Sequence, residues 1–178
     1  MIRLFAAVAV PEDIGHASAR AQRGLPGARW RPLESLHITL RFAGDLPENR
    51  ADDLDAELAV IGGAPFELSL SEVGRFGDGA DIRAVWAGVE ESEPLKRLAT
   101  RCETAARRAG LKVEGRAWRP HVTLAYLHRP DPARVAAWIS AHNLLKSPPF
   151  RVTNFGLYST RRTAEGSIYR LERAYPLA

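Results

Sequence analysis

Hydrophobic and polar residues alternate along much of this chain, and a period of two predicts β-strands. The clearest case is residues 66–73, Phe-Glu-Leu-Ser-Leu-Ser-Glu-Val, whose pattern is that of a half-buried strand. Other stretches are rich in β-branched, apolar and aromatic residues, which favour strands. The strands expected on this basis cover residues 3–10, 28–31, 36–43, 66–73, 82–89, 118–126, 150–158 and 167–174.

Between these strands, apolar residues recur at helical spacing. Residues 48–60 follow Pro47 and carry Ala51, Leu54 and Leu58 on one face, as an amphipathic helix does. The other start signals are Pro, Ser or Asp residues. They introduce three further expected helices, over residues 14–23, 92–109 and 132–141.

The order of these elements predicts an α+β fold, in which helices cover mostly antiparallel sheets. Gly44-Asp45 is expected to form a turn, residues 74–81 a loop, and the basic segment 161–166 the link between the last two strands. A chain of 178 residues can bury a full core, so we expect residues 1–178 to form a single domain.

Composition narrows the class of protein. Apolar content of 46% and charged content of 26% are those of a globular protein. The one cysteine, Cys102, lies on the apolar face of its expected helix and excludes an internal disulfide, which fits the reducing cytoplasm. No apolar stretch approaches the roughly 20 residues that span a bilayer, so no membrane is expected as a partner. The net charge of +4 favours anionic partners.

A four-residue phrase that occurs twice carries the chemistry. His37-Ile38-Thr39-Leu40 and His121-Val122-Thr123-Leu124 each place an imidazole and a hydroxyl two positions apart, on the same face of a strand. Chance would supply roughly 0.01 copies of His-apolar-Thr-Leu in such a chain. The pair predicts two half-sites that face one substrate, with a general acid, a general base and hydroxyls that hold an anion.

Three residues near the phrases are further candidates. Arg41 shares the parity of His37 and Thr39, so on a regular strand it faces the same groove, where a guanidinium suits a phosphate. Trp30 and Trp118 precede the two phrases and fit either a base-stacking role or, preferably, core packing. No metal-binding, P-loop, dinucleotide or serine-hydrolase motif occurs, and we expect neither a metal nor a cofactor.

Together these residues resemble the 2H phosphoesterase superfamily, and more narrowly the RNA 2′,3′-cyclic phosphodiesterases historically called 2′-5′ RNA ligases. The likeness covers nearly the whole chain. It rests on the opening RLFAAVAVPEDI, the two motif stretches LESLHITLRFAGDL and RAWRPHVTLAY, and the tail FGLYSTRRTAEGSIYRLERAYPL.

The resemblance implies a bilobal, pseudo-twofold α+β domain of two fused lobes, whose sheets line a central groove with helices on the outside. It implies that His37 is the proton donor and His121 the proton acceptor, and that Thr39 and Thr123 bind phosphate oxygens. The reaction would open a 2′,3′-cyclic phosphate to a 2′-phosphate without metal, with weak reverse 2′-5′ ligation. The expected partners are RNA ends or cyclic nucleotides, and the protein is expected to act as a cytoplasmic monomer.

One position departs from the family. The family often has Arg two residues after the second motif, where this chain has Tyr126, and neither Arg119 nor Arg129 is obviously placed to substitute. Two alternatives stay open at this point. One is a non-catalytic RNA- or nucleotide-binding module, and the other is an esterase that acts on small cyclic nucleotides.

Overall fold

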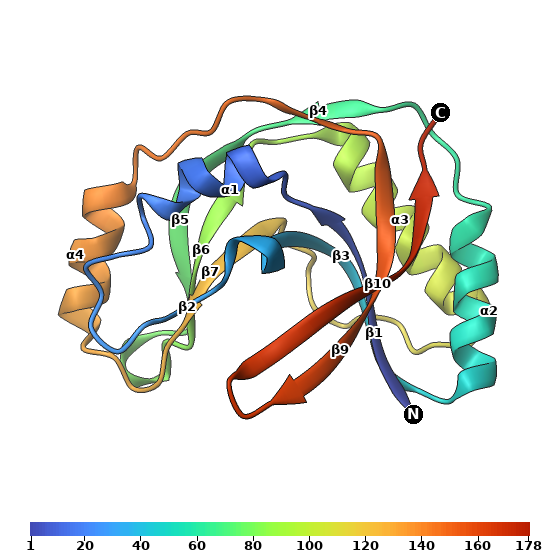
Figure 1. The fold of residues 1–178 in the computed structure, drawn as a ribbon, viewed down its shortest axis with the longest axis horizontal. Helices are drawn as coiled ribbons and strands as arrows, with labels where there is room; N and C mark the ends of the chain where they lie inside the picture. The colour runs from blue at the N-terminus through green and yellow to red at the C-terminus, as the bar shows by residue number, and fades with distance from the viewer.

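The computed structural model describes residues 1–178 and contains ten strands and four α-helices (Figure 1). Eight strands form one antiparallel sheet in the order β10-β9-β1-β3-β7-β6-β5, with β2 paired to β7, and β4 and β8 form a second, two-stranded sheet. The strands are β1 Ile2–Ala9, β2 Arg29–Trp30, β3 His37–Leu46, β4 Phe66–Leu68, β5 Leu70–Phe76, β6 Ala84–Val89, β7 His121–Tyr126, β8 Phe150–Val152, β9 Asn154–Thr163 and β10 Gly166–Pro176. The predicted α+β class with antiparallel sheets is confirmed.

The large sheet consists of two halves that meet at one residue pair. One half holds β10, β9, β1 and β3, the other holds β7, β6 and β5, and only Ile38 and Val122 pair across the junction. In Figure 1 the sheet curves into an arch, and the β9–β10 hairpin extends into its open side. The two sheets implied by the resemblance are therefore two halves of one continuous sheet.

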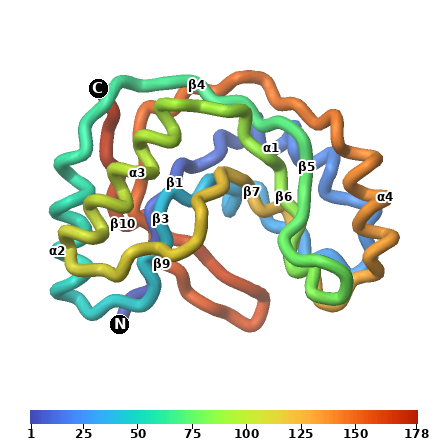
Figure 2. Tube along the Cα trace, turned by 180° about the vertical axis from the view of Figure 1, so that it is seen from behind, coloured from blue at the N-terminus to red at the C-terminus, as the bar shows by residue number.

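Helices cover the outer side of each half (Figure 2). α2 (Glu48–Ala59) and α3 (Glu93–Arg108) lie against the half with β1 and β3, whereas α4 (Pro132–His142) lies beside β5. α1 (Glu12–Ala19) packs on the short 3-10 helix η1 (Leu33–Ser35).

Two of the predicted helix starts carry side-chain caps. Ser92 accepts a hydrogen bond from the backbone N–H of Leu95, and Asp131 accepts one from that of Ala133. Such caps satisfy N–H groups that have no partner within the helix. The predicted starts of α3 and α4 are therefore confirmed.

Three expectations about strands were wrong. Gly44-Asp45 does not end a strand: Gly44 has a φ of 78° at an irregularity within β3, which continues to Leu46. Residues 66–73 split at Ser69, and residues 150–158 split at Thr153, where the chain passes from the small sheet to the large one. The alternation of residue types continues through Ser69 and gives no sign of the first transfer, whereas at Thr153 it shifts by one residue, so that Phe155 rather than Asn154 is the next apolar position.

The interior forms one cluster of 38 buried apolar residues that draws on both halves of the sheet. Cys102 is fully buried within it, and burial raises the pKa of its thiol to about 12, so its predicted place in the core is confirmed. The structure contains no helix with the length and apolar character that crossing a membrane requires.

Candidate active site

The two His-apolar-Thr-Leu phrases lie side by side. β3 begins at His37 and β7 begins at His121, and the strands run antiparallel, joined through Ile38 and Val122. Both of these apolar side chains are fully buried. The half-buried residues on either side of them therefore face away from the core, into the concave side of the sheet.

The register sets which motif residues oppose each other. Because Ile38 pairs with Val122, the antiparallel register places His37 across from Thr123 and Thr39 across from His121. Residues in such positions are about 5 Å apart at Cβ. Each imidazole thus has a hydroxyl beside it on its own strand and another across the junction.

The two imidazoles are held in the same way. Nδ1 of His37 lies 2.8 Å from the backbone carbonyl of Ser35, and Nδ1 of His121 lies 2.7 Å from that of Arg119. A carbonyl oxygen only accepts, so each Nδ1 carries a proton and donates it. The exchangeable position of each ring is therefore Nε2, which is the arrangement that proton transfer requires.

Burial sets the protonation of both rings. Desolvation lowers the pKa of His37 to about 4; the hydrogen bond to Ser35 opposes this shift, and the charges of His121 and Arg31 add to it. Desolvation also lowers the pKa of His121; the hydrogen bond to the carbonyl of Arg119 opposes this shift, and the charge of Arg119 adds to it. Both shifts favour the neutral imidazoles in the free protein, and a bound anion would favour their protonated forms.

Aromatic rings shield both imidazoles from water. Around His37 stand Phe5 and Tyr169, with ring centroids 4.8 and 5.1 Å away. Around His121 stand Phe76, at 4.7 Å, and Trp86, at 6.3 Å. Each histidine is thus packed by two aromatic rings, which restrict its rotation as well as its hydration.

Matching irregularities follow the two threonines. The pairing of β1 with β3 skips Leu40, and the pairing of β6 with β7 skips Leu124. In each strand the bulged leucine and the residue after it are both buried, and the next residue, Phe42 in β3 and Tyr126 in β7, is exposed. Such bulges shift the alternation of faces by one residue.

The bulge at Leu40 overturns the expectation that Arg41 faces the groove. Arg41 is 9% exposed and points toward α3, where its guanidinium binds the carboxylate of Glu103 and the carbonyls of Phe42 and Lys112. The parity argument assumed a regular strand, and the extra residue sends the side chain to the opposite face. Arg41 is a buried structural residue, and we do not propose it as a phosphate ligand.

Trp30 and Trp118 pack against the core, which is the role preferred from the sequence. Trp30 packs on Trp138 of α4, with centroids 6.1 Å apart. Trp118 is packed against the core and its indole N–H donates to the carbonyl of Thr39 at 3.0 Å. This bond ties the segment that leads into the second motif to the first motif.

Sequence reasoning missed Arg31. Its guanidinium lies over the ring of Tyr126 at 5.5 Å and over the ring of Tyr169 at 5.3 Å. A cation therefore does lie beside Tyr126, but the residue that follows β2 supplies it rather than a residue of β7. The β2–β7 pairing brings the two together, and no motif or periodicity in the sequence signals it.

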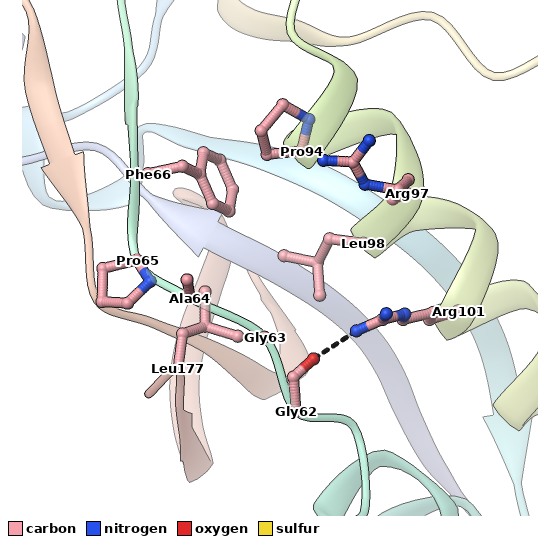
Figure 3. Close-up of a pocket in the computed structure, with 10 residues that line it drawn as sticks. All are labelled: Gly62, Gly63, Ala64, Pro65, Phe66, Pro94, Arg97, Leu98, Arg101 and Leu177. Atoms are coloured by element: carbon pink, nitrogen blue, oxygen red, sulfur yellow. Dashed lines mark hydrogen bonds between the residues drawn. The ribbon is translucent and has the colours of Figure 1, made fainter.

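Two surface pockets lie away from the histidines. One, of about 270 Å³, lies between the segment 62–66 and α3, and Arg97 and Arg101 line it (Figure 3). Arg101 is bound to the carbonyl of Gly62 there. The other, of about 460 Å³, adjoins Arg41 and Lys112. Neither pocket contains a motif residue. No group of three or more His, Cys, Asp or Glu side chains is arranged to hold a metal ion.

The fold and the paired strands define a class of protein with two facing histidine–threonine motifs, and comparison with known proteins identifies the family. A family model described as the 2′-5′ RNA ligase superfamily matches residues 10–164. The RNA 2′,3′-cyclic phosphodiesterase of Archaeoglobus fulgidus is 28% identical, over 98% of this chain and 99% of its own. That of Thermus thermophilus is 30% identical, over 99% and 90%.

Solved structures agree. The crystal structure of TT0787 of Thermus thermophilus superposes with a TM-score of 0.80 at 26% identity and covers 98% of this chain and 97% of its own. Escherichia coli LigT complexed with 3′-AMP superposes with the same TM-score at 24% identity, covering 99% and 98%, and supports the fold. The chain belongs to the 2′-5′ RNA ligase superfamily and is an enzyme, so the resemblance found in the sequence is confirmed.

Proposed function

We propose that the protein hydrolyses 2′,3′-cyclic phosphate ends of RNA to 2′-phosphates by acid–base catalysis between His37 and His121. The observation that carries this proposal is the matched anchoring of both rings through Nδ1, at 2.8 and 2.7 Å, on adjoining strands. The names of the relatives support the substrate class. Each half of the sheet contributes one histidine, so the site is complete only when both halves are present. We therefore propose that residues 1–178 form one domain of two lobes.

The proposed reaction displaces one ribose oxygen from phosphorus by water. His121 takes a proton from the water as its oxygen attacks phosphorus. The bond from phosphorus to the 3′-oxygen breaks, and His37 gives that oxygen a proton. The hydroxyls of Thr39 and Thr123 donate hydrogen bonds to the non-bridging oxygens as charge gathers there. With a 5′-hydroxyl in place of water, the same steps form a 2′-5′ linkage, which accounts for the proposed weak ligation.

The direct test is hydrolysis of a 2′,3′-cyclic nucleotide and of a short RNA with a cyclic phosphate end, in excess EDTA. We expect a 2′-phosphate product and an unchanged rate, because the two imidazoles supply both the acid and the base. A rate lost in EDTA and restored by a divalent ion would contradict the metal-free mechanism. Binding of these RNAs without any turnover would instead indicate a non-catalytic module.

The pH dependence follows from the lowered pKa values. The productive state carries one proton on the histidine pair, and it is populated between the two macroscopic pKa values of that pair. Both histidines have pKa values below the ordinary 6.5, His37 at about 4, so kcat/KM should peak below pH 6.5 and fall as pH rises through neutrality.

The negative charge of bound substrate favours the protonated imidazoles, so the peak of kcat should lie at higher pH than that of kcat/KM. Initial rates from pH 4 to 9, fitted separately for kcat and kcat/KM, test both statements. A kcat/KM that rises steadily to pH 8 would contradict them. The proposed setting is the cytoplasm, whose reducing conditions suit a chain with a single, buried cysteine.

A further inference from the structure

Arg31 occupies an unusual position at the end of β2. Its guanidinium lies between two aromatic rings, 5.5 Å from the centroid of Tyr126 and 5.3 Å from that of Tyr169, and its Nη2 donates to the carbonyl of Ser167 at 3.2 Å. The three contacts come from β7 and from the β9–β10 hairpin. Arg31 is therefore held in place by elements that are far apart in the sequence.

This cation has no counter-charge in the protein. None of the nine ion pairs of the structure includes Arg31. The other half of the sheet offers an internal comparison at Phe42, which follows its bulge as Tyr126 does. There Arg3 lies over the ring of Phe42 at 5.0 Å, but it is neutralised by Asp45 at 3.0 Å.

The guanidinium of Arg31 is half-buried, has no ion-pair partner and packs on two aromatic rings, and this arrangement suits the binding of an anion. Aromatic faces attract a cation, yet they leave its charge and most of its N–H groups available. Planar guanidinium groups bind phosphate oxygens with two parallel hydrogen bonds. Its position favours a phosphate as the missing partner of Arg31.

Arg31 lies beside the two histidines and not between them, since its aromatic contacts are Tyr126 and Tyr169. The ring of Tyr169 lies against the imidazole of His37, at 5.1 Å, and also beneath Arg31. Arg31 reaches His37 only through its electric field, which contributes to the lowered pKa of that ring. The ring of Tyr169 thus contacts both the imidazole of His37 and the guanidinium of Arg31, so a phosphate bound at Arg31 would be a neighbour of the reacting one.

The β9–β10 hairpin places a second cation, Arg162, on the face that contacts Arg31. In the β9–β10 ladder, Tyr169 pairs with Thr160, and Ser167 pairs with Arg162. Residues paired two steps apart share a face, so Arg162 lies on the same face as Tyr169, while Arg161 lies on the other. Figure 1 shows this hairpin extending into the open side of the arch.

We propose that Arg31, held between Tyr126 and Tyr169, binds the internucleotide phosphate that precedes the cyclic phosphate, so that the enzyme selects RNA strands over cyclic mononucleotides. This inference rests on the proposed function and adds a substrate requirement to it. A cyclic mononucleotide has no second phosphate for Arg31 to bind. The shortest substrate that engages it is a dinucleotide with a cyclic phosphate end.

The test compares two substrates, a 2′,3′-cyclic mononucleotide and a dinucleotide that ends in the same cyclic nucleotide. The wild-type enzyme should have the higher kcat/KM on the dinucleotide. Arg31→Gln should lose about 10- to 100-fold on the dinucleotide, mainly through KM, the range expected for hydrogen bonds to a charged group. The same variant should change little on the mononucleotide, and Arg31→Lys should recover part of the loss.

Matched controls separate this effect from a general loss of charge or structure. Arg3→Gln removes the equivalent cation of the other half and should leave the ratio of the two substrates unchanged. An equal loss on both substrates with Arg31→Gln would show that Arg31 acts on the cyclic phosphate itself, and would overturn the proposal. No loss on either substrate would overturn it as well.

Binding gives a readout that does not depend on turnover. The dinucleotide ending in a 2′-phosphate should bind the wild type more tightly than Arg31→Gln. The slope of log affinity against log salt should be smaller for the variant by about 0.7, the value for one phosphate contact on a single strand. Absence of hydrolysis by the wild type would refute the proposed function, whereas an unchanged affinity and salt slope would refute the role of Arg31.

Discussion

Replacing either His37 or His121 with alanine should reduce kcat/KM on a cyclic-phosphate substrate by at least about 10²-fold, because a general acid or base contributes typically 10²–10⁴-fold. Each variant removes the Nε2 that exchanges the proton. The carbonyls of Ser35 and Arg119, which hold Nδ1 of these rings, remain in place. Initial rates measured at the pH optimum of the wild type give the comparison.

The double variant adds a sharper test of coupling. If both rings act in one transition state, loss of the second costs less once the first is gone, so the double variant should lose less than the product of the single losses. Thr39→Ala and Thr123→Ala should cost less than either histidine change, since each removes one donor and leaves the proton transfers intact.

Exposed His128 supplies the control, and His128→Ala should keep the wild-type rate. Circular dichroism establishes that each variant is folded. A folded His37→Ala or His121→Ala enzyme with near wild-type turnover would show that the two-histidine mechanism is wrong.

Arg41→Ala should lower the free energy of unfolding by about 2 kcal/mol, because it leaves the half-buried carboxylate of Glu103 without its charged partner. Arg41 is 9% exposed, and its partner Glu103 is 27% exposed. The substitution also leaves the carbonyl of Lys112 without that donor. Urea denaturation followed by circular dichroism measures the change through the midpoint and slope.

The same variant separates structure from catalysis. Arg41→Ala should leave kcat/KM of the folded enzyme nearly unchanged, since Arg41 points toward α3 and away from the histidines. Arg108→Ala is a suitable control, because its pair with Glu57, at 3.9 Å, is largely exposed and is expected to contribute less than about 1 kcal/mol. A large loss of kcat/KM at unchanged stability would instead indicate that Arg41 contacts the substrate.

The sequence allowed the class of the fold and the central residues of the site to be predicted, for a physical reason. Side chains at i and i+2 on a regular strand share a face, so the pairing of His37 with Thr39 follows from their spacing alone. The helix caps at Ser92 and Asp131 are likewise local. Such features depend on a few neighbouring residues and can therefore be predicted from the sequence.

The features that could not be predicted depend on contacts between distant segments. Arg41 was placed on the wrong face because the bulge at Leu40 arises from the register of β1 against β3. Arg31 was missed because the two rings on which it packs, Tyr126 and Tyr169, are far apart in the sequence and meet only in the folded protein. The anchoring of each Nδ1 by a carbonyl two residues earlier depends on the backbone path before each strand.

The junction at Ile38 and Val122 has a mechanical consequence. The two halves of the sheet share one residue pair, and the histidines lie immediately beside it. In any rotation of the halves about this junction, points near the axis move little and points far from it move much. The two histidines would keep their separation while the outer rims of the arch spread apart. A sheet built in this way can widen its concave side without separating the two histidines that we propose to act on the same phosphorus atom.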